Sequence, residues 1–338
     1  MSETLSAALP LVSIIITSYN RGKTIAKAIE SALAQDYPNL EIVISDNCST
    51  DNSAEIISKY TDDPRVRYTV NETNIGMLEN FRQSIIKKAK GKYFSIVNSD
   101  DEYINPGFIS QGIQLILSHD NVVLVKGGSY HKIGDTGKYH TYEQNATFEN
   151  GREYFKRFRF NEDFGWAGIL LERRYIEEYG LFDQGVIGVD YYINLMLCLI
   201  GNVGFVKKPS YQFNIHGTNS SLAAYSLPQI DEIFSTLDNL FLFAAKEERI
   251  NDVELERVKA HFRYAYVATI LEDYYRNNRK LLPDAELKLR TFAGHLVDDF
   301  YSSKRWKINV IFYYNKKIGD IVSNLKWKLN NLLSGDHK

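Results

Sequence analysis

LVSIIIT, residues 11–17, is a continuous run of apolar and β-branched side chains near the start of the chain. Such a run is typical of a strand buried on both faces of a parallel sheet. The polar turn Asn20-Arg21-Gly22 follows it, and apolar residues then recur at helical spacing from Ile25 to Leu33. The stretch therefore predicts a strand, a turn and a helix, which together open a βαβ unit.

The same alternation continues to about residue 100. Further strands are predicted at residues 40–45 (LEIVIS), 66–70 and 93–97, and helices lie between them, one of them over residues 77–89. Right-handed βαβ crossovers make such strands parallel, and ligands then bind at the carboxyl ends of the strands. We expect an α/β fold with a doubly wound, mostly parallel, Rossmann-like sheet.

The predicted secondary structure changes twice along the rest of the chain. Residues 121–225 mix short strands, Gly-rich turns and aromatic loops, whereas apolar residues recur in helical stripes from about Pro228 to about Phe300. We predict one domain over residues 1–225, with one half at about 11–102 and the other at about 121–225. Residues 226–338 are predicted to form a C-terminal helical appendage.

The composition excludes several classes of protein. Of the 338 residues 44% are hydrophobic and 24% charged, which is ordinary for a globular protein, and a net charge of −2 gives no field that attracts nucleic acid. Cys48 and Cys198 lack the spacing of a metal site or a disulfide framework, which suits a reducing compartment. Residues 1–10 do not resemble a secretory signal, and the apolar stretch 191–206 is too interrupted to span a membrane. We expect a cytoplasmic protein, soluble or attached to a membrane surface.

The predicted strands end in unusually polar segments: TSYNR at residues 17–21, DNCSTD at 46–51 and NSDDE at 98–102. No GxGxxG or GxxxxGK[ST] follows the first strand, so a dinucleotide site or a phosphate loop loses its main support. The adjacent carboxylates of residues 100–102 would repel one another unless a cation lies beside them, and a hard divalent ion that also binds phosphate oxygens fits such a site. The simpler alternative is that these acids only cap a helix that begins near Pro106.

Four segments, taken in order, resemble the family 2 glycosyltransferases, which have the GT-A fold. They are SIIITSYNR at residues 13–21, DNCSTD at 46–51, NIG at 74–76 with Asn80, and NSDD at 98–101. Each segment is weak alone, but the four at normal spacing make a specific match over the first third of the chain. Later segments extend the resemblance to about residue 222.

The resemblance implies a nucleotide-sugar donor, most often UDP-linked, and a divalent metal, Mn²⁺ or Mg²⁺. Asp100 matches the last acid of the family's Asp-x-Asp motif, which binds that metal, and Tyr19 matches the residue that packs against the base. Asn98 replaces the first acid of the motif, and Asn47 replaces the second acid of the usual Asp pair. The positions that match the family's donor-binding residues are Thr17, Tyr19, Arg21, Asp46, Asn74, Asn98, Ser99 and Asp100.

The resemblance also implies an acceptor side and a catalytic base. Trp166 and Gly168 match the family's acceptor-side segment, and Asp101 is expected to contact the acceptor as well. Asp190 matches the catalytic carboxylate, and His216 matches a late histidine that can ligate the metal. Without the family context, Asp190 would be a helix N-cap, His216 a solvated loop residue and Trp166 a core residue.

These positions predict an inverting glycosyltransferase. Asp190 would accept the proton of a hydroxyl on a glycan or lipid-linked glycan, as in the synthesis of cell-surface polysaccharide. A metal at Asp100 and His216 would stabilise the leaving nucleoside diphosphate. Two alternatives stay open. A non-catalytic sugar-nucleotide-binding subunit is favoured by the uncharged Asn98 and Val189. A sugar nucleotidyltransferase would need a Gly-rich, basic loop after the first strand, and residues 18–22 match such a loop poorly.

The segment after Ser302 mixes basic residues with aromatic and aliphatic ones. This pattern suits an anionic membrane surface, such as the inner face of the plasma membrane, where a lipid-linked acceptor would lie. The plainer interpretation is a terminal helix packed on the protein with its lysines in solvent. A peripheral membrane contact and a homo-oligomer both stay open, and no nucleic-acid partner is expected.

Overall fold

The computed structural model describes residues 9–133, 138–142, 147–158, 163–182, 189–215, 225–246, 249–304 and 306–307. The described residues fall into two compact units. One lies within Met1–Ser221 and Asp238–Leu255, and the other within Leu222–Leu237 and Glu256–Lys338. The domain boundary that the sequence suggests at residue 225 stays a prediction.

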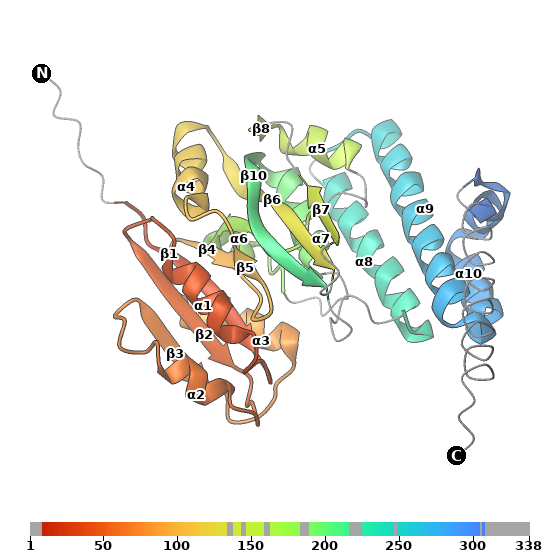
Figure 1. Cartoon of the computed structure of the whole chain (residues 1–338). Coiled ribbons are helices and arrows are strands. Elements are labelled where there is room, and N and C mark those ends of the chain that lie inside the picture. Colours follow the sequence, from red (N-terminus) through yellow and green to blue (C-terminus); the bar gives the residue numbers. More distant parts are fainter. Residues whose placement is uncertain are drawn as a thin grey trace, which may run out of the picture. The chain divides into compact units, whose positions relative to one another are not determined.

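One ten-stranded sheet organises the described residues of the first unit (Figure 1). Its strands lie in the order β3-β2-β1-β4-β9-β6-β10-β5, with β7 paired to β6 and β8 to β10. The bounds are β1 (Val12–Ser18), β2 (Leu40–Asp46), β3 (Val66–Val70), β4 (Tyr93–Ile96), β5 (Glu102–Tyr103), β6 (Val122–Ile133), β7 (Lys138–Tyr142), β8 (Phe148–Glu149), β9 (Ile169–Glu172) and β10 (Asn202–Ile215). β1 is parallel to β2 and β4, β2 to β3, and β6 to β10. The predicted α/β fold with a doubly wound, parallel-dominated sheet is confirmed.

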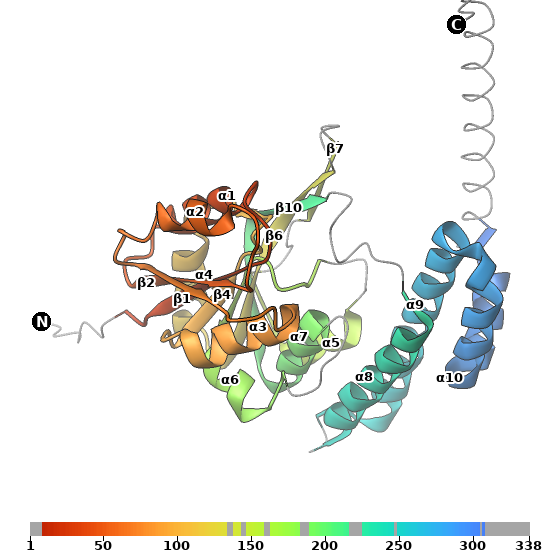
Figure 2. The same ribbon diagram turned by 90° about the horizontal axis from the view of Figure 1, so that it is seen from below.

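Helices cover both faces of this sheet. Figure 2 shows α1 and α2 on one face and α3, α6 and α7 on the other. The helix predicted over residues 77–89 changes type along its length, because a π-helical turn, η1 (Ser84–Lys88), continues α3. The bounds are α1 (Ile25–Leu33), α2 (Ser53–Ser58), α3 (Met77–Gln83), α4 (Phe108–Ser118), α5 (Gly151–Arg157), α6 (Arg173–Glu178) and α7 (Val189–Ile200).

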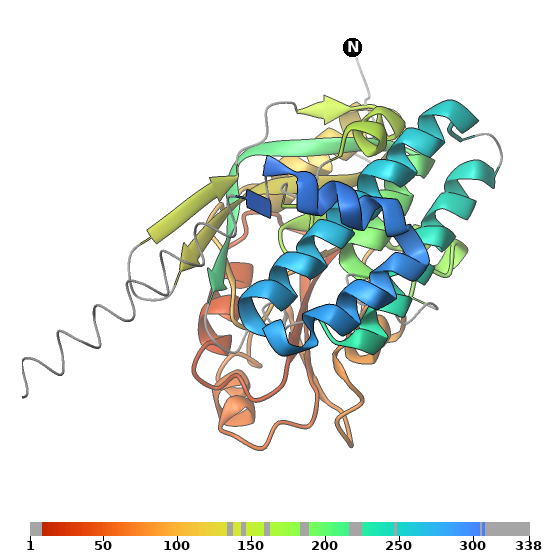
Figure 3. The same cartoon turned by 90° about the vertical axis from the view of Figure 1, so that its right-hand side faces the viewer.

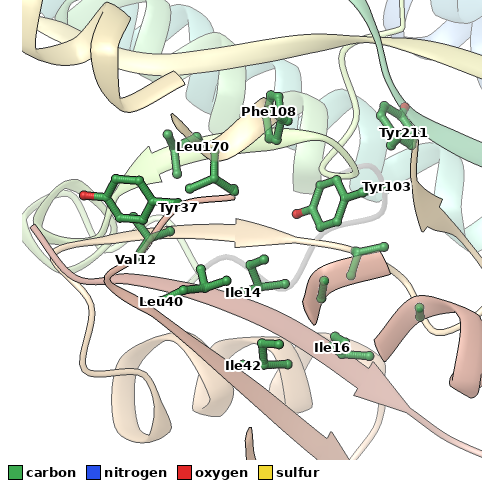
Figure 4. Close-up of a cluster of buried hydrophobic side chains, with 14 of the residues drawn as sticks. Val12, Ile14, Ile16, Tyr37, Leu40, Ile42, Tyr103, Phe108, Leu170 and Tyr211 are labelled. Atoms are coloured by element: carbon green, nitrogen blue, oxygen red, sulfur yellow. The ribbon is translucent and has the colours of Figure 1, made fainter. Parts of the chain in front are cut away.

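The core of the first unit lies between the central strands and α1 and α4. Ile14 of β1 is opposite Ile42 of β2, and both side chains are fully buried in the cluster that Figure 4 shows. Phe108 of α4 stacks on Tyr103 with 5.8 Å between the ring centroids. The β-branched run at residues 11–17 therefore forms a central strand because its side chains are buried on both faces.

The order of the strands reverses between β1 and β4. Strands β2 and β3 extend the sheet on one side of β1, whereas the chain returns on the other side as β4. In doubly wound sheets ligands bind outside the carboxyl ends of the strands at such a switch point. Segment 17–21 begins at the end of β1 and segment 98–101 follows β4, so the fold brings both to the position where a ligand is expected.

The prediction of short strands and Gly-rich turns for residues 121–225 is wrong for its two longest elements. β6 and β10 span twelve and fourteen residues and pair in parallel, with irregularities between Val206 and Tyr211. A Cβ on Gly127 would lie 2.5 Å from the Cβ of Ser210. The glycine that suggests a turn instead allows two strands to approach closely.

The second unit is helical, and the predicted C-terminal helices are confirmed. α9 (Asp252–Asn277) and α10 (Leu282–Ser302) follow α8 (Leu227–Ala245), and Figure 3 shows α9 and α10 side by side. Phe234 of α8, Leu271 of α9 and Val297 of α10 belong to one buried cluster. None of the helices in the described part of the chain combines the length and apolarity needed to cross a membrane. The basic and aromatic residues from 308 onward lie outside the described residues.

Replacing Ile14 with alanine should lower the free energy of unfolding by about 2–5 kcal/mol, because it leaves a cavity in the middle of the sheet. Val70→Ala is the control, since Val70 is 55% exposed on β3 and its loss should cost less than about 0.5 kcal/mol. Urea denaturation followed by circular dichroism measures both. Equal effects of the two substitutions would contradict this description of the core.

Candidate active site

The segments after β1 and β2 are tied together by hydrogen bonds. Asn20 and Cys48 have left-handed backbones, with φ of 53° and 65°, which turn the chain sharply at the two strand ends. The Asn20 N–H donates to Ser49 Oγ at 2.9 Å, and Asn20 Oδ1 accepts from the Thr50 N–H at 2.8 Å. The two loops therefore hold each other in a fixed position at this end of the sheet.

Tyr19 is exposed within these loops, whereas Asp46 is buried. The Tyr19 side chain is 43% exposed, so an aromatic face is available at the end of β1. Asp46 Oδ1 accepts from the Ser49 N–H at 2.9 Å, and Oδ2 accepts from the Tyr68 hydroxyl at 3.2 Å. Burial, together with the charge of Asp46, raises the pKa of Tyr68 to about 12. Asp46 thus holds its own loop, and its contact with a nucleoside stays a prediction.

Asn47 connects the end of β2 to the residues before α3. Its Oδ1 accepts from the Ile75 N–H at 3.0 Å, and its Nδ2 donates to Asn74 Oδ1 at 2.7 Å. Asn74 Oδ1 also accepts from the Gly76 N–H at 2.9 Å. An aspartate at position 47 could accept but not donate, so the asparagine that departs from the family pattern suits Asn74.

Asp100 lies beside Arg21 at the switch point. Its Oδ2 is 3.5 Å from Arg21 Nε, and the side chains keep 12% and 32% of their surface accessible, respectively. The alternative in which the acids cap a helix is wrong, because α4 begins only at Phe108 and its first turn contains no acidic residue. The structure therefore brings together two of the predicted donor residues, Arg21 from the β1 loop and Asp100 from the β4 loop.

Asp101 is enclosed between the β4 loop and β10. It is 1% exposed, its Oδ1 accepts from the Asn214 N–H at 2.8 Å, and its Oδ2 accepts from Asn98 Nδ2 at 2.8 Å. Asn214 Nδ2 in turn donates to the Asp100 carbonyl at 2.7 Å. Burial raises the pKa of Asp101 to about 7 despite these hydrogen bonds. Ser99 is also buried. The predicted contact of Asp101 with an acceptor stays a prediction.

The β4 loop fits a divalent cation that is bound partly by its substrate. Mg²⁺ and similar ions are commonly held by one or two carboxylates together with phosphate and water oxygens. Asp100 offers one partly accessible carboxylate, and Asn98 uses its amide nitrogen toward Asp101, which leaves its oxygen as the remaining polar atom. Within the described residues, no group of three or more His, Cys, Asp or Glu is arranged so that it could hold a metal ion. His216, the second predicted ligand, lies outside them.

The acceptor-side segment lies beside the end of β4. Ala167 bridges to Ile96, the last residue of β4, and the Gly168 N–H donates to the Ile96 carbonyl at 3.3 Å. Trp166 is 8% exposed, with its ring 5.2 Å from those of Phe81 and Phe182. It is thus largely a core residue, and its contact with an acceptor stays a prediction.

Two carboxylates flank Gly165 in this segment. A Cβ added to Gly165 would lie 3.0 Å from Asp190 Oδ2 and 3.9 Å from Asp163 Oδ1. Asp190 is the second residue of α7 and keeps part of its surface accessible. Asp101 and Asp163 also lie close enough for the charge of Asp163 to act on Asp101. The predicted base therefore has a second acid as its neighbour, close to the end of β4.

Asp163 and Asp190 have opposite electrostatic environments. Burial would raise the pKa of Asp163, but the positive charge of Lys126, the neighbouring His131 ring and a hydrogen bond from Tyr211 hold it well below its usual range. Asp163 Oδ2 is 3.7 Å from Lys126 Nζ, and the Tyr211 hydroxyl donates to the same carboxylate. Burial instead raises the pKa of Asp190, although Lys126 opposes this. The charged form of Asp163 is therefore stabilised, whereas the raised pKa makes Asp190 the stronger proton acceptor of the two.

The strand order with its switch point between β1 and β4, and the acidic loop after β4, define a GT-A fold. Residues 13–180 match the family model described as Glycosyl transferase family 2. The chain belongs to the family 2 glycosyltransferases.

Relatives of known name support this membership. The succinoglycan biosynthesis protein ExoO of Rhizobium meliloti is 29% identical over 299 residues, which cover 85% of this chain and 80% of that protein. The chondroitin synthase of Pasteurella multocida is 26% identical over 335 residues, which cover 98% of this chain but only 33% of the synthase. The chain therefore spans most of the first relative and about a third of the second.

Solved structures share the fold. S. aureus TarS 1–349 in complex with UDP-GlcNAc superposes with a TM-score of 0.67 at 17% identity and covers 86% of this chain and 83% of that one. The mannosyltransferase PcManGT from Pyrobaculum calidifontis, in complex with GDP-Man and Mn²⁺, gives 0.54 at 13% identity and covers 91% and 88%. At these identities the similarity concerns the fold alone.

The sequence interpretation misses Lys126 and Asp163. Lys126 is the single charged residue in the apolar strand VVLVK at residues 122–126, and that isolation is a signal that could have identified it. Asp163 follows Asn161 and Glu162 in the sequence and carries no pattern of its own, so only the folded structure reveals it.

Gly168→Ala should destabilise the protein by about 1–3 kcal/mol, because φ at Gly168 is +65° and the added Cβ would lie 2.1 Å from the Tyr211 ring. Gly294→Ala is the control, since a Cβ at that position meets nothing within 4 Å. Thermal denaturation compares the two variants. A Gly168→Ala protein as stable as the control would show that the close approach to Tyr211 is not required.

Proposed function

We propose that this family 2 glycosyltransferase is an inverting enzyme that transfers a sugar from a UDP-sugar to a hydroxyl of a glycan or lipid-linked glycan. The observation that carries the proposal is the pair of carboxylates around Gly165, Asp163 and Asp190, whose environments drive their pKa values apart. Pairs of this kind divide into a permanently charged group and a group that exchanges protons. A non-catalytic sugar-nucleotide-binding subunit has no need of such a pair.

The donor side of the proposal rests on the loops at the switch point. The exposed ring of Tyr19 offers a surface for a nucleobase, and Arg21 beside Asp100 offers a positive charge for a diphosphate. UDP is favoured over GDP because TarS, solved with UDP-GlcNAc and with UDP, superposes better than PcManGT, solved with GDP-Man. Four further residues are proposed to complete the donor site through the loops that they support: Thr17, Asp46, Asn74 and Ser99.

Asp100 and the oxygen of Asn98 are proposed to hold Mn²⁺ or Mg²⁺, with His216 as a further ligand. When bound, such an ion supplies positive charge that stabilises the leaving nucleoside diphosphate. PcManGT was solved in complex with GDP-Man and Mn²⁺, which supports this choice. Arg21, which pairs with Asp100 at 3.5 Å, contributes a second positive charge at the same loop.

Asp190 is proposed as the general base. It accepts the proton of the acceptor hydroxyl as that oxygen attacks the anomeric carbon, and the nucleoside diphosphate leaves from the opposite face of the sugar. A single displacement of this kind inverts the configuration at the anomeric carbon. Asp163 is the less suitable base, because the charge of Lys126 and the hydrogen bond from Tyr211 stabilise its charged form.

The acceptor is proposed to be a growing polysaccharide. The relatives are named for succinoglycan biosynthesis and for chondroitin synthesis, and both names concern the synthesis of a polysaccharide. Trp166, Gly168 and Asp101 are proposed to border the acceptor. A cytoplasmic location at the inner face of the membrane, a peripheral membrane contact and a homo-oligomer stay predictions.

A UDP-sugar should raise the melting temperature of the protein, and Mn²⁺ should increase the shift. Binding at 100 times the dissociation constant adds about 2.7 kcal/mol to the stability of the folded state. Asp100→Ala should lose the Mn²⁺-dependent part of the shift, whereas Asp62→Ala, at an exposed position, should keep it. A panel of UDP- and GDP-sugars measured by thermal shift tests this, and an unchanged Mn²⁺ effect in Asp100→Ala would remove Asp100 as a ligand.

Asp190→Asn should reduce turnover by about 10²–10⁴-fold while nucleotide binding stays near the wild-type value, because the amide cannot accept the proton. Turnover is measured as release of UDP from the donor that gives the largest thermal shift, and binding by calorimetry with UDP. Asp120→Asn, at an exposed position, is the matched control. Wild-type turnover in Asp190→Asn would mean that another group is the base.

A further inference from the structure

Lys126 is a fully buried lysine close to the carboxylates of Asp163 and Asp190. It belongs to β6, and its side chain has no accessible surface. Its Nζ donates to the Ala167 carbonyl at 2.6 Å and to the Gly165 carbonyl at 3.2 Å, and it lies 3.4 Å from the Tyr211 hydroxyl. An ammonium group has three donors, and these three oxygens are sufficient to satisfy them.

The two carbonyls that Lys126 binds stand on either side of Trp166. One ammonium group therefore fixes the backbone both before and after the predicted acceptor-side residue. The next residue of β6 continues the attachment, since the Gly127 N–H donates to the Gly168 carbonyl at 2.8 Å. The whole segment from Gly165 to Gly168 is thus held by two successive residues of one strand.

The charge of Lys126 is balanced by nearby acids, of which Asp163 lies 3.7 Å from its Nζ. Burial lowers the pKa of Lys126, and the negative charges of Asp163 and Asp190 oppose that effect. An isolated lysine at such a depth would tend to lose its proton, whereas one close to two carboxylates keeps it. The same attraction acts on the acids, so Lys126 favours the ionised form of Asp190 as well as that of Asp163.

We propose that Lys126 is a positioning residue for the transfer reaction, which holds the Gly165–Ala167 segment in place and provides the positive charge that faces Asp190 and Asp163. This inference rests on the proposed function, since it concerns the base of that reaction. Lys126 touches neither donor nor acceptor in this scheme. It acts through the backbone on which the acceptor side is built and through the charge of the base.

Other titratable groups also face this cluster. Asp163 lies before β9, His131 lies on β6 and Tyr211 lies on β10, and all three contact one another or Lys126. Asp101 faces them from the β4 loop and Tyr191 from α7, where the Phe164 N–H lies 3.4 Å from the Tyr191 hydroxyl. Since Asp101 and Asp163 are acids, loss of Lys126 would leave Asp190 with a larger negative charge around it.

The test compares Lys126→Met, which keeps the apolar length of the side chain and removes its charge, with Lys207→Met at an exposed position of β10. UDP release from the donor identified by thermal shift gives kcat and KM as functions of pH, and calorimetry with UDP gives the nucleotide affinity. We expect kcat to fall at least about tenfold in Lys126→Met, with the donor KM and UDP affinity unchanged. The acidic limb of the kcat profile should move to higher pH by about one unit, because the base without its neighbouring cation is protonated more readily.

Lys126→Gln separates the two parts of the proposal. Glutamine keeps a donor for the carbonyls but carries no charge, so it should recover part of kcat while its acidic limb stays shifted. A Lys126→Met protein that binds UDP normally, with wild-type kcat and an unmoved limb, would overturn the proposal. If both variants lost UDP binding as well as turnover, the proposal would also be overturned, since Lys126 would then support folding alone. If the wild-type protein releases no UDP from any donor, the proposed function fails instead.

Discussion

The structure of the candidate site depends on one buried carboxylate, that of Asp101. Its two oxygens bind the Asn214 N–H at the end of β10 and the Asn98 amide at the end of β4, each at 2.8 Å. These partners are more than a hundred residues apart in the sequence, and the donor loop and the acceptor half of the sheet meet through them. Because Asp101 is enclosed and its pKa is raised to about 7, the connection needs both hydrogen-bond donors to offset the cost of burying the acid.

The two departures from the family pattern have the same physical explanation. Asn98 and Asn47 replace acids of the family motifs, and in each case the amide nitrogen donates to an acceptor oxygen, that of Asp101 or that of Asn74. An aspartate at position 98 would bring a second carboxylate within about 3 Å of the buried Asp101, and like charges at that distance repel strongly. The amides therefore do not by themselves argue for a site that has lost its chemistry. They preserve the shape of the loops and reduce the negative charge in them.

The donor half could be predicted from the sequence because its signals are local. The β-branched run of β1, the periodicity of α1 and the polar strand ends follow from neighbouring residues alone, and the positions of Arg21 and Asp100 follow from the topology. The environment of Asp190 could not be predicted, because Lys126 and Asp163 reach it from segments far apart in the chain. The extent of β6 and β10 was also beyond prediction, since Gly127 is compatible with a turn and with a close contact between strands. Only the Ser210 side chain opposite it decides between the two.

That contact limits how the protein can diverge. A side chain at position 127 would collide with Ser210 on one neighbour and come within 3.0 Å of Phe108 on another, so any larger residue must shift both elements at once. Substitutions that alter acceptor preference, whether by evolution or by design, are therefore poorly tolerated where β6 and β10 pack together. They are more readily made at exposed positions of the same strands, such as Lys208 of β10, where a new side chain displaces solvent rather than packed side chains.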